Sequence, residues 1–502
     1  MKSQVSQRLK EPVTQAVLDL IYQRRLDEDF VANFPMITLI NRAHVIMLLH
    51  QSILTPETAR ALLLACDEME RTGPTGHVPD PRLEDPYFNY EAAVVRIVGA
   101  DTGGRMHIAR SRNDLQATFQ RLHCRNAALA LSDRVHALIA MLLERADQYA
   151  DVVMPGYTHM QPAQPSTYGF YLLGLAEAFM RDSCRLDEVW PRINLNPLGA
   201  AAMTGTGFPI DRDLTASLLG FDGVIEHTQD CVASRDFALE LLAICVQMAV
   251  TWSRLAQDVF TMVMNEFQTL ELPDKVAGTS SIMPQKKNPV IMEHLKGKSA
   301  VVLGAYVAAA TAMRATSFSN TIDGNRESLV MAWGTFRECC DCLKLTSLMV
   351  EAAQPNRARM LTLTEQNFST ATDLADAMVR DCGLSFRDAH HVVGAVVRMA
   401  MDRGLTANQI TSDLVDQAAR DVLRRPLGMQ AATVTNSLDP THAVATNGTV
   451  GGPSPTEVRR RVAVMRHTLA AARTVQSGRY SRLAEADQRL HAAVRHVSEH
   501  RT

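Results

Sequence analysis

SRDFALELLAICVQMAVTWSRLAQDVFTM, residues 234–262, is the stretch that decides the fold class of this chain. Ser234 is a suitable N-cap, and Asp236 falls in the first turn, where a negative charge is favoured. About thirty residues at about 1.5 Å each predict a helix about 45 Å long. Its apolar residues recur at steps of three and four, the period of an amphipathic helix: they are Phe237, Leu241, Ile244, Met248, Trp252, Leu255, Val259 and Met262.

Other long stretches have the same character. Residues 105–154 contain neither glycine nor proline, and residues 326–353 contain Gly334 as their one helix breaker. Helices this long need parallel or antiparallel partners to bury their apolar stripes, and clear period-two strands are scarce. The sequence therefore predicts an all-α protein built around a bundle of long helices. A further helical stripe consists of Leu172, Leu175, Phe179, Leu186 and Trp190.

Composition narrows the class of protein. The 502 residues are 46% hydrophobic and 5% aromatic, which suits two or three domains with large aliphatic cores. A net charge of −3, from 51 basic and 54 acidic residues, gives no overall field for nucleic acid or an acidic membrane. The nine cysteines show no repeated C-x-x-C pair and no His/Cys set at zinc spacing. They predict reduced thiols in a cytosolic protein and no metal site.

Targeting signals are not visible either. The N-terminal stretch MKSQVSQR, residues 1–8, has no apolar core of the kind that a secretion signal needs. The most apolar run, residues 301–313, is too short to span a bilayer and is predicted to be a buried bundle helix. We therefore expect a cytoplasmic protein with no membrane partner. Residues 447–455, rich in glycine and proline, are expected to form a surface loop.

The loop GTSSIMPQKKNP, residues 278–289, carries the most chemistry for its length. Its first glycine allows unusual backbone angles, and its two prolines oppose a regular helix. Such a loop is able to close over an anionic substrate, with Lys286 supplying charge and Ser281 a hydroxyl. Backbone N–H groups in the same loop are able to form an anion-binding nest. The alternative is a polar surface loop without a function.

Two further segments carry candidate site residues. Ser111, Arg112 and Asn113 open a long helix, where the N-terminus favours anions and arginine binds a carboxylate bidentately. The alternative is an N-cap followed by a solvated arginine. His159 follows Thr158 in a segment bounded by prolines, although a lone histidine is more often structural.

Together these segments resemble the argininosuccinate lyase branch of the aspartase/fumarase superfamily, in the family's order and over most of the chain. Residues 278–289 resemble the signature G-[ST]-S-x-M-P-x-K-x-N. Residues 104–114 resemble G-x-x-H-T-G-R-S-R-N-D, and residues 155–165 resemble P-G-Y-T-H-L-Q-x-A-Q-P. Shorter blocks of the same family resemble residues 196–200, 208–212, 370–376 and 386–390.

The resemblance implies an architecture. Members have three domains, which here would be an N-terminal helical cap at 1–111, a central long-helix bundle at 112–366 and a C-terminal helical domain at 367–502. They are homotetramers whose central helices form a shared core, and each active site takes residues from three subunits. Segments 105–114, 155–165 and 278–293 would then meet only in the assembly.

The resemblance also implies a reaction. Members eliminate an amine from a succinyl group and release fumarate without a cofactor, through an aci-carboxylate intermediate. By resemblance Ser281 is the general base. His159, hydrogen-bonded to Glu293, would help to protonate the leaving group. The substrate would be held by Ser111, Arg112, Asn113, Thr158, Ser280, Met283, Lys286, Asn288 and Arg326.

Departures from the family pattern concern the amine side of the substrate. Where argininosuccinate lyases carry Y-N-x-D-L-Q-E-D-K-E, this chain has FSNTIDGNRE, residues 318–327. The aspartate that follows K-K-N-P is replaced by Val290, and the histidine of E-D-x-H by Tyr87. The chain is more similar to the lyases of ethylenediamine-N,N′-disuccinate, which would be converted to N-(2-aminoethyl)aspartate and then ethylenediamine. Argininosuccinate is the alternative substrate, and a non-catalytic, crystallin-like protein is the alternative of another class.

Overall fold

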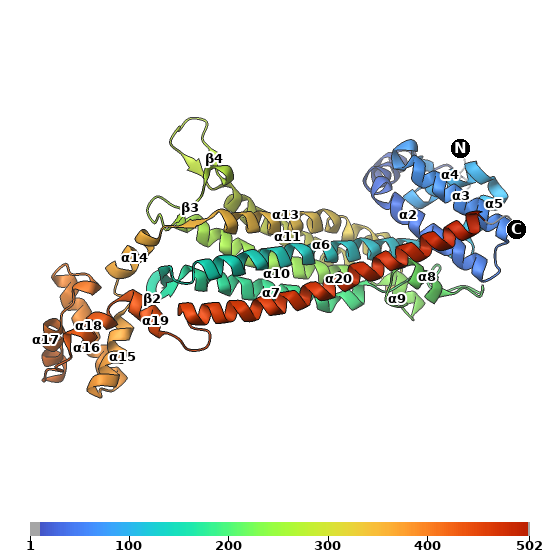
Figure 1. The fold of residues 1–502 in the computed structure, drawn as a ribbon. Helices are drawn as coiled ribbons and strands as arrows, with labels where there is room; N and C mark the ends of the chain where they lie inside the picture. Colours follow the sequence, from blue (N-terminus) through green and yellow to red (C-terminus); the bar gives the residue numbers. More distant parts are fainter. Residues whose placement is uncertain (1–10, 500–502) are drawn as a thin grey trace.

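The computed structural model describes residues 11–499, and Figure 1 shows an elongated helical molecule. Residues 1–8, on which the expectation of no secretion signal rests, lie outside the described residues. The all-α prediction is confirmed. The centre is a bundle of long helices: α6 (Arg112–Gln148), α7 (Tyr168–Ile193), α10 (Asp236–Met262), α11 (Val290–Met313) and α13 (Ala332–Ala352).

The bundle helices bury one continuous apolar core. Helix α6 packs against α7 and α13, and α10 packs against α11 and α7. The predicted stripe of α10 lies in this core, where Leu241, Met248 and Trp252 are fully buried. Burial of a large side chain contributes about 1.5–3 kcal/mol. The bundle is therefore stabilised by the periodic residues that predicted it.

The start of α10 differs from the expectation. Asp236 lies in the first turn as predicted, but the N-cap is Arg235, and its side chain makes no capping bond. Ser234 instead ends the short helix α9 (Thr228–Ala233), and its hydroxyl donates to Asp230. The predicted Ser234 cap was wrong because a second helix ends immediately before α10 and takes the hydroxyl.

A helical domain lies at one end of the bundle, and its core, which includes Phe34 and Tyr90, also contains Leu122 of α6. Its first helix contains a π-helical turn, η1 (Leu18–Gln23), between α1 (Gln15–Val17) and α2 (Arg24–His50). The other elements of this domain are α3 (Pro56–Thr72), η2 (Pro74–Gly76), η3 (Pro81–Leu83), α4 (Pro86–Val98), α5 (Ala100–Gly104) and η4 (Arg105–His107).

A second group of helices lies at the opposite end of the bundle (Figure 1) and has a separate apolar core. The chain reaches it through α14 (Arg357–Gln366). The group consists of α15 (Ala371–Cys382), α16 (Phe386–Asp402), η7 (Ala407–Gln409), α17 (Ser412–Leu423), α18 (Ala431–Ser437) and α19 (Pro440–Thr446).

The last helix, α20 (Pro455–Glu499), runs back along the whole bundle (Figure 1). Nη1 of Arg479 donates to Oδ1 of Asp187 on α7 at 2.6 Å, and Nε of Arg60 on α3 donates to the carbonyl of Ser498 at 2.9 Å. The division at 111 and 366 stays a prediction. Helix α20, which falls in the proposed C-terminal range, packs on the bundle and on the N-terminal helices.

The strands in the described residues form three small antiparallel pairs. The longest pair, β1 (Val153–Thr158) with β2 (Gln161–Thr167), is a hairpin that the sequence did not predict. The other pairs are β3 (Leu270–Glu271) with β6 (Gln354–Pro355) and β4 (Gly278–Thr279) with β5 (Lys287–Asn288). Short helices complete the chain: α8 (Arg212–Leu219), η5 (Asp274–Val276), α12 (Ile322–Asn325) and η6 (Glu327–Leu329).

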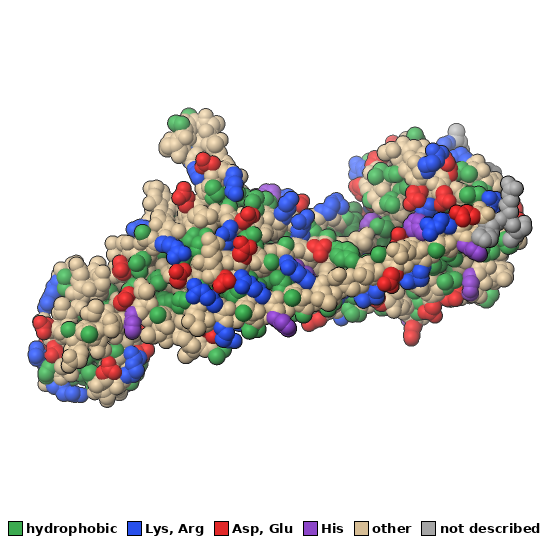
Figure 2. Space-filling model, viewed as in Figure 1, with side chains coloured by type: hydrophobic (Ala, Val, Ile, Leu, Met, Phe, Trp, Pro, Cys, Tyr) green, Lys and Arg blue, Asp and Glu red, His purple; other side chains and the backbone are tan. Residues whose placement is uncertain are grey.

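Part of the bundle surface is apolar, and Figure 2 shows hydrophobic side chains over its visible face among charged ones. On α11 the residues Val301, Leu303 and Val307 are each about half exposed. The prediction that residues 301–313 are buried was therefore wrong for one face of this helix. Exposed aliphatic residues on a packed helix are typical of a surface that contacts another protein.

Three helical stretches of the described chain are long and apolar enough to cross a membrane, judged by length and composition alone: Gln15–His50, Arg112–Gln148 and Asp236–Met262. In the structure 72%, 56% and 50% of their most apolar windows, respectively, is buried inside the protein. Their apolar residues thus serve the helical cores described above.

Candidate active site

The first group of predicted site residues opens helix α6. Ser111 is the N-cap, and its Oγ accepts a hydrogen bond from the N–H of Asn113 at 3.3 Å. Asp114 completes a capping box, because its Oδ1 accepts from the N–H of Ser111 at 2.9 Å. Its Oδ2 accepts from the N–H groups of Gly199 and Ala201 at 2.9 and 3.0 Å. Burial raises the pKa of Asp114 to about 6.

Arg112 is held by two carboxylates of its own chain. Its Nη1 donates to Oε2 of Glu84 at 2.9 Å and to Oδ2 of Asp85 at 3.0 Å. Its guanidinium carbon lies 4.4 Å from the ring centroid of Phe88. Burial acts to lower the pKa of Arg112, but the carboxylates of Asp85 and Glu84 outweigh it, so the pKa is raised.

Arg326 lies near this group and makes three ion pairs within its own chain. Its Nη2 lies 2.8 Å from Oε2 of Glu28, its Nε 3.3 Å from Oδ2 of Asp29, and its Nη1 2.7 Å from Oε1 of Glu327. The side chain is 16% exposed. In the single chain Arg326 therefore ties α2 to the turn before α13, and its proposed contact with a substrate stays a prediction.

The second group lies at the far end of α6. Thr158 ends β1, and His159 and Met160 form the two-residue tip of the hairpin. Both tip residues have positive φ, 52° and 58°, as a type I′ turn requires. Non-glycine residues in this conformation are strained and often mark functional sites. The His159 side chain is exposed and has no hydrogen-bond partner among the described residues.

The third group lies on the loop between β4 and β5, which projects from the bundle in Figure 1. Ser281 is exposed at the tip side of this loop. Oγ of Ser280 accepts from the N–H of Met283 at 3.0 Å, and the N–H of Lys286 donates to the carbonyl of Met283 at 3.1 Å. These bonds fold the loop locally while leaving the Ser281 hydroxyl and the Lys286 ammonium open to solvent.

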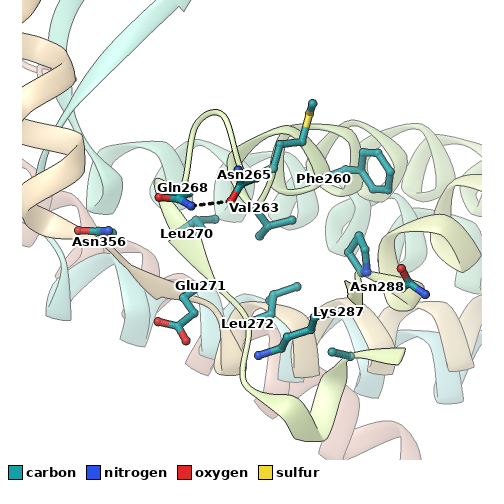
Figure 3. Close-up of a pocket in the computed structure, with 13 residues that line it drawn as sticks. Phe260, Val263, Asn265, Gln268, Leu270, Glu271, Leu272, Lys287, Asn288 and Asn356 are labelled. Carbon is teal, nitrogen blue, oxygen red and sulfur yellow. Dashed lines mark hydrogen bonds between the residues drawn. The ribbon is translucent and has the colours of Figure 1, made fainter. Parts of the chain in front are cut away.

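The neck of the loop is better fixed than its tip. Nδ2 of Asn288 donates to the carbonyl of Thr279 at 3.1 Å, and Nζ of Lys287 lies 2.8 Å from Oδ1 of Asp274. Figure 3 shows Lys287 and Asn288 beside a cavity of about 530 Å³ at the base of the loop. The end of α10, including Phe260, lines the other side. The neck thus anchors the loop to the bundle.

Glu293 lies in the first turn of α11, five residues beyond Asn288, and is exposed. The expected hydrogen bond between His159 and Glu293 is not present within the described chain, where neither side chain has a partner. The pairing stays a prediction for residues of different subunits.

The geometry separates the groups widely. Ser111 and His159 flank a helix of 37 residues, which at about 1.5 Å per residue is about 55 Å long. Figure 1 places the hairpin and the start of α6 at opposite ends of the bundle. No single copy of the chain is therefore able to bring Ser111, Arg112 and Asn113 to the same ligand as His159.

Sequence reasoning missed the residues that surround Arg112. Glu84 and Asp85, the acidic pair just before Pro86 and Tyr87, hold Arg112 directly. An acidic residue before Pro86, at the start of a helix, is a recognisable N-cap signal. Tyr87 is buried and makes a 2.8 Å hydrogen bond with Nδ1 of His107, so its role in the single chain is internal.

Comparison with known families agrees with this architecture. Residues 37–304 match the lyase family, and residues 368–445 match the argininosuccinate lyase C-terminal domain. The first match covers more than half of the chain and includes the Ser111, His159 and Ser281 segments.

Curated relatives are similar over nearly the full length. Argininosuccinate lyase 1 of Shouchella clausii is 36% identical over 481 residues, 96% of this chain and 97% of the relative. Argininosuccinate lyase of Methanoculleus marisnigri is 38% identical over 432 residues, 86% of this chain and 87% of the relative.

Solved structures give the same family. EDDS lyase in complex with formate has a TM-score of 0.88 and 31% identity, and covers 99% of this chain and 98% of its own. A variant of EDDS lyase with bound fumarate has a TM-score of 0.87 and 32% identity, with coverage of 98% and 97%. Class II fumarase from Schistosoma mansoni, at 16% identity, shares the fold. The chain belongs to the argininosuccinate lyase branch of the aspartase/fumarase superfamily and is a fumarate-releasing carbon–nitrogen lyase.

Proposed function

We propose that this lyase cleaves N-succinyl amines, with ethylenediamine-N,N′-disuccinate as the leading substrate and Ser281 as the general base. The Ser281 alkoxide takes a proton from the carbon beside a substrate carboxylate. The electron pair moves onto that carboxylate as an aci-carboxylate, and its return to carbon breaks the carbon–nitrogen bond. The amine leaves with a proton, and fumarate remains.

The observation that carries this proposal is the projecting loop between β4 and β5. It presents the exposed hydroxyl of Ser281 and the ammonium of Lys286 on a neck fixed by Asn288. The aci-carboxylate carries two negative charges, which cationic side chains and oriented N–H groups stabilise best. Lys286 and the loop amides provide groups of this kind next to the base and also favour its alkoxide.

The separation of the three groups supports an active site shared between subunits of a homotetramer. Ser111, Arg112 and Asn113 would bind a substrate carboxylate, and Thr158 and His159 would come from a second subunit. The loop from Ser280 to Asn288, with Met283, would come from a third. The half-exposed aliphatic residues of α11 support a contact between copies through the bundle.

His159 has a role in this proposal that depends on its partner. A hydrogen bond donated by His159 to the Glu293 carboxylate of another subunit would fix the tautomer and orientation of the imidazole. His159 would then orient a substrate carboxylate or donate a proton to the leaving amine. Arg326 would reach the substrate only by leaving Glu28 and Asp29.

The preference for ethylenediamine-N,N′-disuccinate is supported by the two structures of EDDS lyase and by the departures near the amine. Phe318 and Val290 put apolar groups where argininosuccinate lyases carry a tyrosine and an aspartate. The alternative substrate is argininosuccinate, which the names of the curated relatives favour. A crystallin-like role without catalysis would not require the base loop, which this chain retains.

A substrate panel tests the proposal. The purified protein is offered ethylenediamine-N,N′-disuccinate, argininosuccinate and several N-alkyl aspartates, and fumarate is followed by its ultraviolet absorbance. Fumarate release that is fastest with the disuccinate is the expected result. Fastest release with argininosuccinate would replace the leading substrate, and no release with any compound would contradict the proposal. We expect the protein to work in the cytoplasm, where these small molecules are its partners.

A further inference from the structure

We infer that Glu84, Asp85 and Phe88 are positioning residues that orient Arg112 for a carboxylate of the substrate. The inference rests on the proposed function, in which Arg112 binds that carboxylate. It concerns residues that do not themselves touch the substrate and act through the guanidinium.

The contacts fix Arg112 in two directions. Nη1 is shared between the carboxylates of Glu84 and Asp85, at 2.9 and 3.0 Å. One face of the guanidinium lies over the ring of Phe88, at 4.4 Å from its centroid. No hydrogen bond within the described chain uses Nε or Nη2 of Arg112. The edge formed by these two atoms is the one that binds a carboxylate through two parallel hydrogen bonds.

The holding groups are themselves rigid. Asp85 is the N-cap of α4 and is buried, with a relative exposure of 3%. Its Oδ1 accepts from the N–H of Phe88 at 2.9 Å, while its Oδ2 accepts from Arg112. One carboxylate thus fixes the helix that carries Phe88 and the guanidinium that lies on Phe88. A guanidinium that is already held before a ligand binds loses little freedom on binding.

Glu84 is held in an unusual backbone conformation. Its φ is 68° and its ψ is −45°, a combination that a residue with a side chain rarely adopts. Such strain persists only where surrounding contacts maintain it, and it concentrates at functional sites. In this conformation the Glu84 carboxylate, which is 19% exposed, accepts from Nη1 of Arg112 at 2.9 Å.

Simple charge attraction does not explain this arrangement. Carboxylates outnumber guanidiniums in this cluster, since Arg25, Arg112 and Arg326 face Glu28, Asp29, Glu84, Asp85 and Glu327. Two carboxylates beside Arg112 reduce its attraction for a substrate dianion, because each adds a negative charge nearby. A site that retains them gains orientation at the expense of charge. Removal of Glu84 therefore weakens substrate binding if this carboxylate orients Arg112, and strengthens substrate binding if its negative charge dominates.

The test measures the dissociation constant of fumarate by calorimetry and the KM of the leading substrate. Glu84→Ala is expected to weaken fumarate binding and raise KM by on the order of tenfold, with a smaller change in kcat. Glu84→Gln keeps an acceptor for Nη1 and removes the charge, so it is expected to bind fumarate at least as well as wild type. Asp80→Asn is the matched control, because this carboxylate of the same turn pairs with Arg82.

A double variant distinguishes positioning from general stability. If Glu84 acts through Arg112, Glu84→Ala adds no further loss of fumarate binding to Arg112→Ala. Additive losses, or tighter binding by Glu84→Ala than by wild type, would overturn the inference. If wild type binds fumarate but converts no N-succinyl amine, the proposed function is overturned. Fumarate binding by the Glu84 and Arg112 variants still tests the positioning role in that case. Wild type that does not bind fumarate would overturn both.

Discussion

Arg326 and Asp29 are 297 positions apart in the sequence and are joined by a hydrogen bond from Nε to Oδ2 of 3.3 Å. Glu28 accepts a second bond from Arg326, at 2.8 Å. These contacts fasten helix α2 of the N-terminal domain to the turn between α11 and α13. Because Asp29 is only 24% exposed, loss of Arg326 would leave this half-buried carboxylate with the longer, 3.9 Å ion pair to Arg25.

We predict that Arg326→Met lowers the free energy of unfolding by about 1–2 kcal/mol, less than for a fully buried pair because water reaches part of the site. Denaturant unfolding measures this change. Arg71→Met is the matched control, since Arg71 is 75% exposed and pairs with Glu68 on the same helix. Its expected effect is below about 0.5 kcal/mol. Equal effects of the two substitutions would show that the Arg326 pairs do not stabilise the contact between domains.

A second prediction concerns acid stability. Burial, with Arg337 nearby, lowers the pKa of His123 to about 4. An unfolded histidine has a pKa of about 6.5, so between these values the unfolded chain binds a proton that the folded chain does not. The folded state therefore has its full stability above about pH 6.5 and loses it as the pH falls, by about 1.4 kcal/mol per unit for each such histidine.

His123→Gln tests this pH dependence, because glutamine offers an N–H to Asn33, which His123 contacts at 2.9 Å. Unfolding free energies are compared at several values between about pH 5 and 7. The variant is expected to have a shallower acid slope, by about one proton. The same slope in both proteins would mean that His123 binds protons equally in the folded and the unfolded state. His44, whose pKa burial also lowers, accounts for part of the remaining slope.

Local periodicity predicted the bundle well, because the residues that repeat along α10 are those that the fold buries. It did not predict the β1–β2 hairpin, whose sequence contains Pro155, Pro162 and Pro165. Proline usually argues against a strand because it cannot donate to the ladder. In a two-stranded hairpin each strand is an edge, and Pro155 lies opposite Pro165. The ladder therefore does not need those donors.

The sequence predicted the candidate site as a set of separate segments, and the structure shows where each segment lies on the bundle. Sequence placed Ser111, His159 and Ser281 on three separate motifs, and the structure separates the motifs as well. The sequence could not reveal the partners of Arg326, because Glu28 and Asp29 lie in the first helix and no local pattern connects them to Arg326. The contact between Glu84 and Arg112 could not be predicted from the sequence either, because it depends on a strained turn.

The proposed sharing of each active site between subunits leads to a third prediction. A His159→Ala variant and a Ser281→Ala variant, each inactive alone, should recover part of the wild-type activity when they are unfolded together and refolded as a mixture. Recovery is expected because mixed tetramers contain some sites with both intact residues. Separately refolded and then combined samples are the control. Proven subunit exchange without recovery would mean that both residues of a site come from one subunit.

The fourth prediction concerns the leaving group. A secondary alkyl amine resembles lysine, with a pKa on the order of 10, and is already an ammonium at neutral pH. It is able to leave without a separate proton donor. His159→Asn, which keeps a hydrogen-bonding group, is therefore expected to lose less activity on ethylenediamine-N,N′-disuccinate than Ser281→Ala loses. If wild type loses activity on the alkaline side with a pKa near that of histidine, and His159→Asn is as inactive as Ser281→Ala, His159 is an essential acid.

The most direct test of the account is the rate at which Ser281→Ala releases fumarate. Loss of a general base is expected to lower kcat by at least about 100-fold, because the methyl group of alanine cannot accept the substrate proton. Ser253→Ala, on helix α10, is the matched control, and the melting temperature and the oligomeric state of both variants are compared with wild type. The account predicts a folded, assembled Ser281→Ala protein that releases almost no fumarate. Release at near wild-type rate by that folded protein would contradict it.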